Sequence, residues 1–496
     1  MRSLVLGLVL AVAPPAPATV DGYLADALEA TGLPGVSVVV THGDRIVHAT
    51  GAGHDSLDNP VTADTPMRVA SVSKSFTAAA AMTLVEDGRV ELDGPVGLPG
   101  IPRDVTVRQL LNQTSGLSDS SVDIGRLKSA RTLAEYVSLL PPVTPAAPPG
   151  TRWAYSNVNY DLAARLVEVA SGQPFDEYVR EHVFEPLGMR DSSVGGWAAD
   201  GYNSLFGVWF SRPELGGGPA VQGSGAVVTT ARDMGRWLIA QNGHGPFPES
   251  MLRTMHEPST VDEYGMGWSP DDDGLLVHSG NLWTYNAIQA IDPKTGYGYA
   301  VMTNGAGMAD ETGAILAGLV ALTRGETPET PGGSGQLIEW VLAALTALAL
   351  TLGIMGVLRS KRWMKHRLTR RNHEISTPVD HSATGNPTPT RSRGRPAVPV
   401  YRQGVTGTST SILAVDNSVG CGQLRWWVWL RLLPLLLPGL LFVFYPQVVS
   451  YISAGRTVLW AQLFYFALPL TVTLAVAGVA GLAVFVARVV RLRSVR

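Results

Sequence analysis

The sequence has 496 residues, 45% of them hydrophobic, with 38 Lys and Arg against 41 Asp and Glu and a formal net charge of −3. This apolar content excludes a disordered or collagen-like chain, and one cysteine, Cys421, excludes an internal disulfide framework and a multi-cysteine metal site. Residues 1–335 hold 20 basic and 37 acidic side chains, a net of −17, whereas residues 336–496 hold 18 and 4, a net of +14. An acidic region without a basic stripe is a poor nucleic-acid binder.

The N-terminus has the pattern of a secretory signal peptide, residues 1–18. Arg2 precedes an apolar run, and residues 16–18 read Ala-Pro-Ala, a small-x-small cleavage pattern. An uncleaved anchor is the alternative, although the run is short for about 30 Å of hydrocarbon. In both cases the domain that follows, residues 19–330, is exported.

The exported domain mixes helical and strand patterns. Runs rich in β-branched residues predict strands at 36–40, 46–49 and 299–302. Helical periodicity covers 73–86, 161–170, 175–182 and 231–241. Thr229 and Thr230 are candidate N-caps of the last of these helices, with Asp233 in its first turn. Strands at both ends of the domain suggest a sheet in which the last strands pair with the first.

The strongest chemical signal is Ser71-Val72-Ser73-Lys74, at the start of a predicted helix. Residues i and i+3 share one helix face, so the Ser71 hydroxyl and the Lys74 amine can meet. A serine nucleophile needs such a base, and N–H groups at a helix N-terminus stabilise developing negative charge. Ser-x-x-Lys alone is common by chance and then marks only a solvated helix start.

Two further segments supply context for this motif. Tyr155-Ser156-Asn157 precedes a predicted helix, where a phenol near a lysine can shuttle a proton and an amide can orient a substrate carbonyl or the lysine. His278-Ser279-Gly280 ends an apolar run, and its glycine would let a substrate lie close along a strand.

Together the three segments resemble the motifs of the penicillin-recognising serine hydrolases, the superfamily of serine β-lactamases and D,D-peptidases. The second motif, Tyr-x-Asn, resembles that of one branch of the superfamily, which includes class C β-lactamases, D-aminopeptidases and esterases. The resemblance covers about residues 20–325, and further landmarks follow in order at 106–117, 184–189, 229–237 and 264–268. It implies an α/β (α+β) fold of the β-lactamase/transpeptidase type, with an antiparallel sheet flanked by helices and an all-α subdomain.

The resemblance also implies the roles of individual residues. Ser71 would be the acyl-accepting nucleophile, and Lys74 and Tyr155 would handle its proton, with the general base open between these two. Asn157 would contact the substrate amide, and the backbone N–H groups of Ser71 and Asn281 would form the oxyanion hole. No metal or other cofactor is implied, and water would complete hydrolysis.

The third motif departs from the family pattern at its first residue. Many members have lysine where this chain has His278. We expect His278 and Gly280 to bind substrate, but a histidine, with a pKa of about 6.5, carries a conditional charge near neutral pH. The expectation that the substrate carries a carboxylate is therefore weaker.

Lys294-Thr295-Gly296 has the family's Lys-Thr-Gly sequence but lies in Asp-Pro-Lys-Thr-Gly between two apolar runs, which predicts a hairpin turn. Five other histidines show no shared ligand spacing, so we expect them to be surface or hydrogen-bonded residues: His42, His48, His54, His244 and His256.

The C-terminal third predicts three transmembrane helices. Residues 337–358 are apolar, of spanning length, and followed by clustered Arg and Lys typical of a cytoplasmic flank. Residues 430–451 contain three prolines, so an interfacial hairpin is the alternative to a span. Residues 457–487 form the third apolar stretch, followed by a basic cytoplasmic tail, 488–496. Residues 359–423, rich in Pro, Ser, Thr and Arg, predict a basic, disordered cytoplasmic loop.

These patterns predict a multi-pass protein of the cell membrane with an extracytoplasmic catalytic domain. Its expected activity is that of a β-lactamase-related serine hydrolase of carboxypeptidase, D-aminopeptidase or esterase type. It would form an acyl-enzyme with a β-lactam, a D-amino peptide or an ester. The sequence does not distinguish among these three substrate classes. The alternative is a non-hydrolytic cell-wall or β-lactam sensor that signals through its membrane helices; the extra spans favour it, and the retained nucleophile opposes it.

Overall fold

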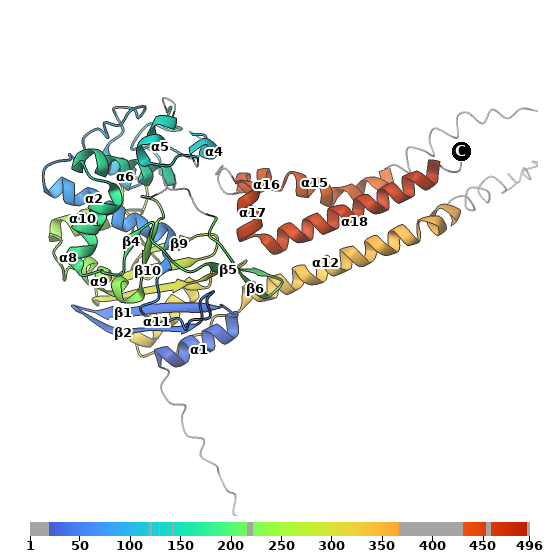
Figure 1. Ribbon diagram of the computed structural model, residues 1–496, viewed down its shortest axis with the longest axis horizontal. Helices are drawn as coiled ribbons and strands as arrows, with labels where there is room; N and C mark the ends of the chain where they lie inside the picture. Colours follow the sequence, from blue (N-terminus) through green and yellow to red (C-terminus); the bar gives the residue numbers. More distant parts are fainter. Residues whose placement is uncertain are drawn as a thin grey trace, which may run out of the picture. The chain divides into compact units, whose positions relative to one another are not determined.

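The computed structural model describes residues 19–118, 122–127, 129–140, 143–215, 222–366, 430–452 and 458–493 (Figure 1). The chain divides into two compact units, the first comprising Met1–Thr346 with Val443–Thr473 and the second Ala347–Phe442 with Leu474–Arg496. The predicted signal peptide and most of the predicted loop 359–423 lie outside the described residues, although residues 360–366 of that loop are helical.

The first unit is built on a six-stranded antiparallel sheet in the order β2-β1-β11-β10-β9-β8. Its strands are β1 Gly35–His42, β2 Arg45–Gly53, β8 Ser269–Pro270, β9 Leu276–Asn281, β10 Asn286–Asp292 and β11 Tyr297–Thr303. The predicted pairing of the last strands with the first is confirmed, because β11 lies against β1 with Val38 opposite Val301.

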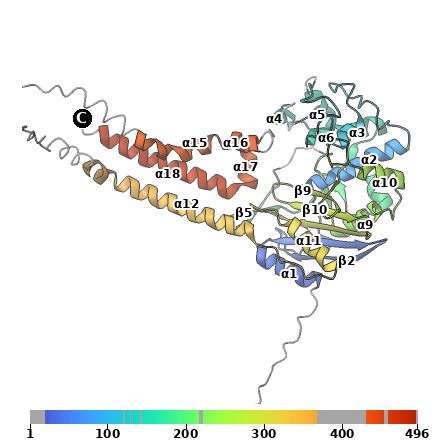
Figure 2. The ribbon, with the colours of Figure 1, turned by 180° about the vertical axis from the view of Figure 1, so that it is seen from behind.

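Helices cover both faces of this sheet (Figures 1 and 2). Successive side chains of a strand point to opposite faces. Val38 and Val40 accordingly join the apolar cluster of α1 (Val20–Thr31) and α11 (Thr312–Thr323), whereas Val39 joins the larger cluster on the other face. That larger cluster is formed mainly by α2 Ser73–Glu86, α6 Asn157–Ser171, α7 Phe175–Val179, α9 Ala231–Gln241 and α10 Glu249–His256.

Helix α6 links the sheet layer to a third apolar cluster. Tyr160 and Ala163 of α6 pack in the larger cluster, and Val158 and Leu162 pack in the third one. The third cluster also contains residues of α3 Val107–Leu111, α4 Ile124–Leu127 and α5 Leu133–Leu139. This placement holds the first turn of α6, which begins at Asn157, against the first turn of α2.

Short elements complete the first unit. The three-stranded sheets are β3 Met67–Arg68, β7 Val227–Thr229 and β4 Ser193–Val194, and β12 Gly305–Ala306, β5 Gly201–Leu205 and β6 Val208–Arg212. The remaining turns of helix are η1 Ala70–Val72, η3 Arg180–Phe184, which is a π-helix, and α8 Glu185–Leu187.

Local sequence signals define several helix ends. Helix α9 begins and ends where predicted, and the Thr230 Oγ1 accepts a hydrogen bond from the Asp233 N–H over 3.2 Å as its N-cap. Helix α2 also has its predicted bounds. Helix α6 begins four residues before its predicted start, and the predicted helix 175–182 continues from α7 into the π-helix η3.

Two helices are long and apolar enough to cross a membrane, α12 Ser334–Leu358 and α18 Leu468–Arg493. The second predicted span is instead a bent pair of helices, Leu430–Val443 and Tyr445–Ile452, with 62° between them. This pair includes η4 Leu433–Leu436, α15 Leu437–Val443 and α16 Tyr445–Ile452. Of the three predicted transmembrane helices, two are thus present as long apolar helices, and the second stretch is either a broken span or a hairpin. The third predicted stretch is divided into α17 Trp460–Phe466 and α18, with Pro469 at the start of α18, where its missing N–H is tolerated.

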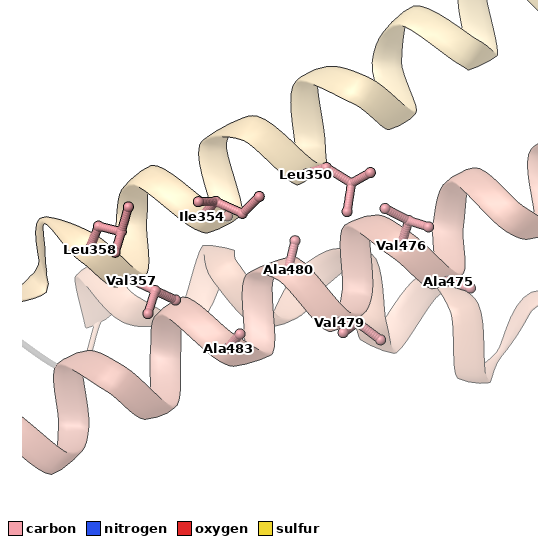
Figure 3. Close-up of a pocket in the computed structure, with 10 residues that line it drawn as sticks. Leu350, Ile354, Val357, Leu358, Ala475, Val476, Val479, Ala480 and Ala483 are labelled. Carbon is pink, nitrogen blue, oxygen red and sulfur yellow. The ribbon is translucent and has the colours of Figure 1, made fainter.

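The second unit contains an apolar groove of about 470 Å³ between α12 and α18 (Figure 3). Its lining consists of aliphatic side chains, including Leu350 and Ile354 of α12 and Val476 and Val479 of α18. Leu348 and Ile354 are 52% and 60% exposed. Apolar side chains exposed over whole helices are typical of segments whose solvent is lipid.

Candidate active site

Ser71 lies in η1, the tight turn that leads into α2. The residue before it, Ala70, is buried and has a φ of +52°, which is uncommon for a residue with a side chain. A left-handed backbone at such a residue stores about 1–2 kcal/mol of strain, and strain of this kind clusters at functional sites. Alanine gives no sequence signal for this conformation, so sequence analysis missed it.

Lys74 lies one helical turn after Ser71 and is fully buried. Its Nζ donates hydrogen bonds to the Ser71 Oγ (3.0 Å), the Asn157 Oδ1 (2.8 Å) and the Ser224 carbonyl oxygen (2.8 Å). The structure thus brings together three of the predicted site residues. It adds Ser224, which lies in no recognised motif and contributes only a backbone atom.

The partners of Lys74 differ in what they can exchange with it. The Asn157 Oδ1 and the Ser224 carbonyl oxygen can only accept hydrogen bonds. The Ser71 hydroxyl can accept or donate, so it alone can give its proton to a neutral Lys74 amine. Ser71 is also partly exposed, which leaves its oxygen accessible to a substrate.

Aromatic side chains surround the Lys74 amine. Its Nζ lies 4.9 Å from the centre of the Tyr155 ring and 5.6 Å from that of Tyr160, within the range of a cation–π interaction. Tyr155 in turn packs with Trp153 and perpendicular to Tyr264, with ring centres 6.3 Å apart in both pairs. The predicted tyrosine is therefore beside the predicted lysine, in a partly exposed position.

His278 is buried at the edge of this aromatic group. Its Nδ1 lies 2.7 Å from the Ser279 carbonyl oxygen, which only accepts, so Nδ1 carries the proton and Nε2 accepts from the Tyr264 hydroxyl over 2.9 Å. Burial, followed by the charge of Lys74, lowers the pKa of His278 to about 3. The prediction of a conditional charge near neutral pH is wrong, because His278 stays neutral there.

Gly280 allows strand β9 to approach the turn that carries Ser71. A Cβ at this position would lie 2.3 Å from the Val69 carbonyl oxygen and 2.9 Å from the Ser71 backbone nitrogen. No side chain fits at these distances, so the glycine is required for close backbone approach.

Beyond this contact β9 is an edge strand of the sheet. Strand β8 pairs only with Leu276 and Val277, so residues 278–281 have no second strand partner among the described residues. Asn281 is exposed at the end of this edge, and its Nδ2 donates to the Asn286 Oδ1 over 2.7 Å. Unpaired edge groups can bond an extended substrate.

Asp161 is a buried acid behind Lys74 that sequence analysis did not single out. Its Oδ1 accepts a hydrogen bond from the Ser224 N–H over 3.1 Å, and its Oδ2 has no hydrogen-bond partner. Burial raises the pKa of Asp161 to about 7, against the opposing effects of the Ser224 hydrogen bonds and of Lys74. Asp161 therefore holds the residue whose carbonyl oxygen binds the Lys74 amine.

The Lys-Thr-Gly segment forms a hairpin turn, as predicted. Lys294-Thr295-Gly296 forms the turn between β10 and β11, with the Lys294 N–H bonded to the Asp292 Oδ1 and a φ of +77° at Gly296. Among the other histidines, His256 is hydrogen-bonded to Gln241, and burial lowers its pKa to about 4. Within the described ranges no three His, Cys, Asp or Glu residues lie close enough to hold a metal.

Comparison with known proteins supports the family suggested by this geometry. The model of the family described as "Beta-lactamase" matches residues 20–322. The chain belongs to the beta-lactamase family. Its relatives in this superfamily of serine hydrolases include penicillin-binding protein homologues, and its family match ends before α12.

The curated relatives that match this domain include the two that follow. Protein flp of Staphylococcus aureus (strain MW2) is 25% identical over 316 residues, covering 58% of this chain and 62% of its own. Penicillin-binding protein 4 of Amycolatopsis lactamdurans is 35% identical over 171 residues, covering 32% of this chain and 44% of its own. The chain thus spans less than two thirds of the length of either relative.

Solved structures show the same fold. A penicillin-binding protein from Bacillus halodurans has a TM-score of 0.53 and 25% identity, covering 60% of this chain and 98% of that one. An octameric penicillin-binding protein homologue from Pyrococcus abyssi has a TM-score of 0.52 and 24% identity, covering 63% and 78%.

Proposed function

We propose that this protein is a membrane-anchored serine hydrolase that acts outside the cytoplasm on an amide or an ester through an acyl-enzyme. One observation carries the proposal. The Lys74 amine is fixed by two atoms that only accept, Asn157 Oδ1 and the Ser224 carbonyl oxygen, and its third contact is the hydroxyl of Ser71. A buried amine aimed at an accessible hydroxyl is an arrangement suited to nucleophilic catalysis.

The proposed reaction follows from these contacts. The Ser71 Oγ forms a bond to the substrate carbonyl carbon while its proton passes to Lys74 or to Tyr155. That proton then goes to the leaving amine or alcohol as the carbonyl–N or carbonyl–O bond breaks. The backbone N–H groups of Ser71 and Asn281 would stabilise the oxyanion, and water would release the acid.

The surroundings of β9 support a substrate that is recognised without an obligatory carboxylate. His278 is neutral and engaged with Tyr264, so it supplies no cation. Residues 278–281 have no second strand partner among the described residues, and their edge would supply backbone groups to the substrate instead. We infer that neutral esters and D-amino amides or peptides suit the site better than substrates held by a charge pair, β-lactams with a free carboxylate included.

The direction of the apolar helices supports three membrane crossings. Helices α12 and α18 both begin in the first unit, which contains the catalytic domain, and continue into the second. If both helices leave the same side of a membrane, the chain between them must return across it. The bent pair Leu430–Val443 and Tyr445–Ile452 is the apolar segment available for that return. The basic residues after α12 and at the end of α18 then lie in the cytoplasm.

A non-hydrolytic sensor is the second candidate function. It is favoured by hydrogen bonds that join Glu339 in the second turn of α12, and Phe464 just before α18, to the β5–β6 hairpin of the domain. In that case Ser71 would accept an acyl group once and not release it.

A substrate panel on the full-length protein in detergent micelles tests the proposal. The panel contains neutral esters, D-amino acid amides and a penicillin, with Ser71→Ala as the blank. We expect many product molecules per protein with at least one neutral substrate and none with the blank. Product limited to one molecule per protein would favour the sensor, and equal turnover by Ser71→Ala would contradict both functions.

A further inference from the structure

Glu339 is a buried acid at the start of an apolar helix. It is the only acidic residue of α12 and is 2% exposed. Its Oε2 accepts hydrogen bonds from the Ser204 hydroxyl (2.6 Å) and from the Gly207 N–H (2.8 Å). Because buried carboxyl groups persist only with partners, these two bonds fix the start of α12 to the β5–β6 hairpin.

The same hairpin holds the loop that joins β9 to β10. Asn203, the neighbour of Ser204, is fully buried, and its Nδ2 donates to the Trp283 carbonyl oxygen over 2.7 Å. Gly201 lies so close to this loop that a Cβ there would be 2.3 Å from the Thr284 carbonyl oxygen. The loop starts after Asn281, whose backbone N–H belongs to the proposed oxyanion hole.

A second set of bonds fixes the other side of the same loop. Glu214, two residues after β6, accepts from the Trp283 N–H over 3.3 Å and from the Thr284 hydroxyl over 2.7 Å. The carbonyl and the N–H of Trp283 are therefore both bonded to the hairpin or its extension. The position of Trp283 depends on that of the hairpin.

The segment before α18 contacts the hairpin as well. The Arg212 guanidinium donates to the Asn203 Oδ1 (3.2 Å) and to the Phe464 carbonyl oxygen (2.7 Å), and it lies 3.6 Å from the centre of the Tyr465 ring. The Tyr465 hydroxyl donates to the Pro213 carbonyl oxygen over 3.1 Å. The start of α12 and the segment before α18 thus converge on one hairpin.

We propose that the β5–β6 hairpin couples the start of α12 to the loop 282–285, which directly follows the predicted substrate-binding residues His278, Gly280 and Asn281, with Glu339 as a positioning residue. The proposal rests on the proposed hydrolase function for its kinetic consequence. Ser71, Lys74 and Asn157 lie on other elements, and Asn281 is held by its pairing with Asn286 of β10. Loosening the hairpin therefore displaces the loop and leaves the reacting groups and the oxyanion hole in place. Glu339→Ala is expected to raise KM for a neutral ester about three- to tenfold with kcat within about twofold.

Further variants test whether the hydrogen bonds of Glu339, and not the volume of its side chain, position the loop. Glu339→Gln keeps one side-chain oxygen that can accept both bonds, so it is expected to restore KM to within about twofold of the wild type. Glu329→Ala removes an exposed acid ten residues earlier, before α12 begins, and is expected to leave KM unchanged. Glu339→Ala combined with Asn203→Ala is expected to raise KM no more than the larger single effect, because both act through one path.

Hydrogen exchange of the full-length protein in micelles tests the coupling independently of activity. Glu339→Ala is expected to speed exchange in the peptide covering 282–286, with α2 and α6 unchanged, whereas Glu339→Gln and Glu329→Ala match the wild type. Unchanged exchange in that peptide overturns the proposal even if the enzyme is active, and local acceleration supports it even if no turnover is found. If Glu339→Ala does not fold, Ser204→Ala, which removes one of the two bonds, must give the same local acceleration, and its absence overturns the proposal.

Discussion

Lys74 and Glu339 are both buried ionisable side chains, but they lie in different kinds of surroundings. Lys74 is bonded to atoms from η1, α6 and the segment before β7, and one of those atoms is an accessible hydroxyl. Glu339 is bonded, among the described residues, to one hairpin through Ser204 and Gly207. Convergence of several elements on a group that can exchange a proton is what distinguishes a reaction centre from an anchor.

Removing the Lys74 amine should have the largest effect. Lys74→Ala leaves Ser71 without its buried partner, and we expect kcat/KM to fall by about 10³-fold, within the range of general acid–base catalysis. Lys294→Ala is the matched control, since Lys294 lies in the β10–β11 turn despite its Lys-Thr-Gly sequence. Steady-state kinetics measures both variants. Equal losses of kcat/KM in the two would contradict the assignment of Lys74, and not Lys294, to the reaction centre.

A third buried ionisable group, Asp161, extends the comparison to stability. Its pKa of about 7 lies above its ordinary value of 3.8, so the folded state holds the proton more tightly than the unfolded chain. Protonation of Asp161 therefore contributes up to about 4 kcal/mol to the free energy of unfolding. This contribution is complete below about pH 4 and is lost as pH rises through about 7. The Asp161→Asn variant has no ionisable group at this position and therefore lacks this pH dependence.

Thermal unfolding at pH 5 and pH 8 measures this difference. The wild type is expected to lose more stability than Asp161→Asn between the two values. An identical pH dependence in the two proteins would mean that Asp161 is paired or solvated and does not hold Ser224 as described.

Gly280 tests the close approach of β9 to Ser71. Gly280→Ala places a methyl group 2.3 Å from the Val69 carbonyl oxygen, and overpacking of this kind lowers the free energy of unfolding by about 1–3 kcal/mol. Gly313→Ala is the control, because no atom lies within 4 Å of its added Cβ in α11, and alanine should stabilise that helix by about 0.5–1 kcal/mol. Chemical denaturation in micelles compares the two, and equal effects would contradict the tight contact at Gly280.

The smallest expected effect concerns pH and His278. Because its pKa is about 3, protonation of His278 contributes no inflection to kcat/KM between pH 5 and pH 8. His278→Gln should lower activity without changing the shape of that profile. An inflection near pH 6.5 that disappears in the variant would show that His278 is solvated and can carry the charge its sequence position suggested.

Sequence patterns predicted the parts of this molecule that depend on local chemistry. Helices α2 and α9 have their predicted bounds, because capping and apolar periodicity act within a few residues. The pairing of β1 with β11 was predicted from the positions of apolar runs. The family resemblance predicted that Ser71, Lys74 and Asn157 belong to the site. In the structure the Lys74 Nζ is within hydrogen-bond distance of the other two side chains.

The features that were missed depend on contacts between distant segments. Ser224 contributes a backbone carbonyl, which any residue type supplies, and the left-handed Ala70 has no compositional mark. The neutrality of His278 comes from burial, which a single sequence does not report. Glu339 was counted within an apolar span, although its carboxyl group is bonded to a hairpin more than a hundred residues earlier. The bend between α15 and α16, by contrast, agrees with the alternative to a span that the three prolines of residues 430–451 suggested.

Labelling of the full-length protein with a fluorophosphonate probe, followed by peptide mass spectrometry, tests the central claim most directly. Ser71, Ser73 and Ser75 lie close together in the sequence, but only Ser71 is partly exposed, whereas Ser73 and Ser75 are buried. We predict a single adduct on Ser71, absent from Ser71→Ala. An adduct on another serine, or undiminished labelling of Ser71→Ala, would contradict the assignment of Ser71 as the nucleophile.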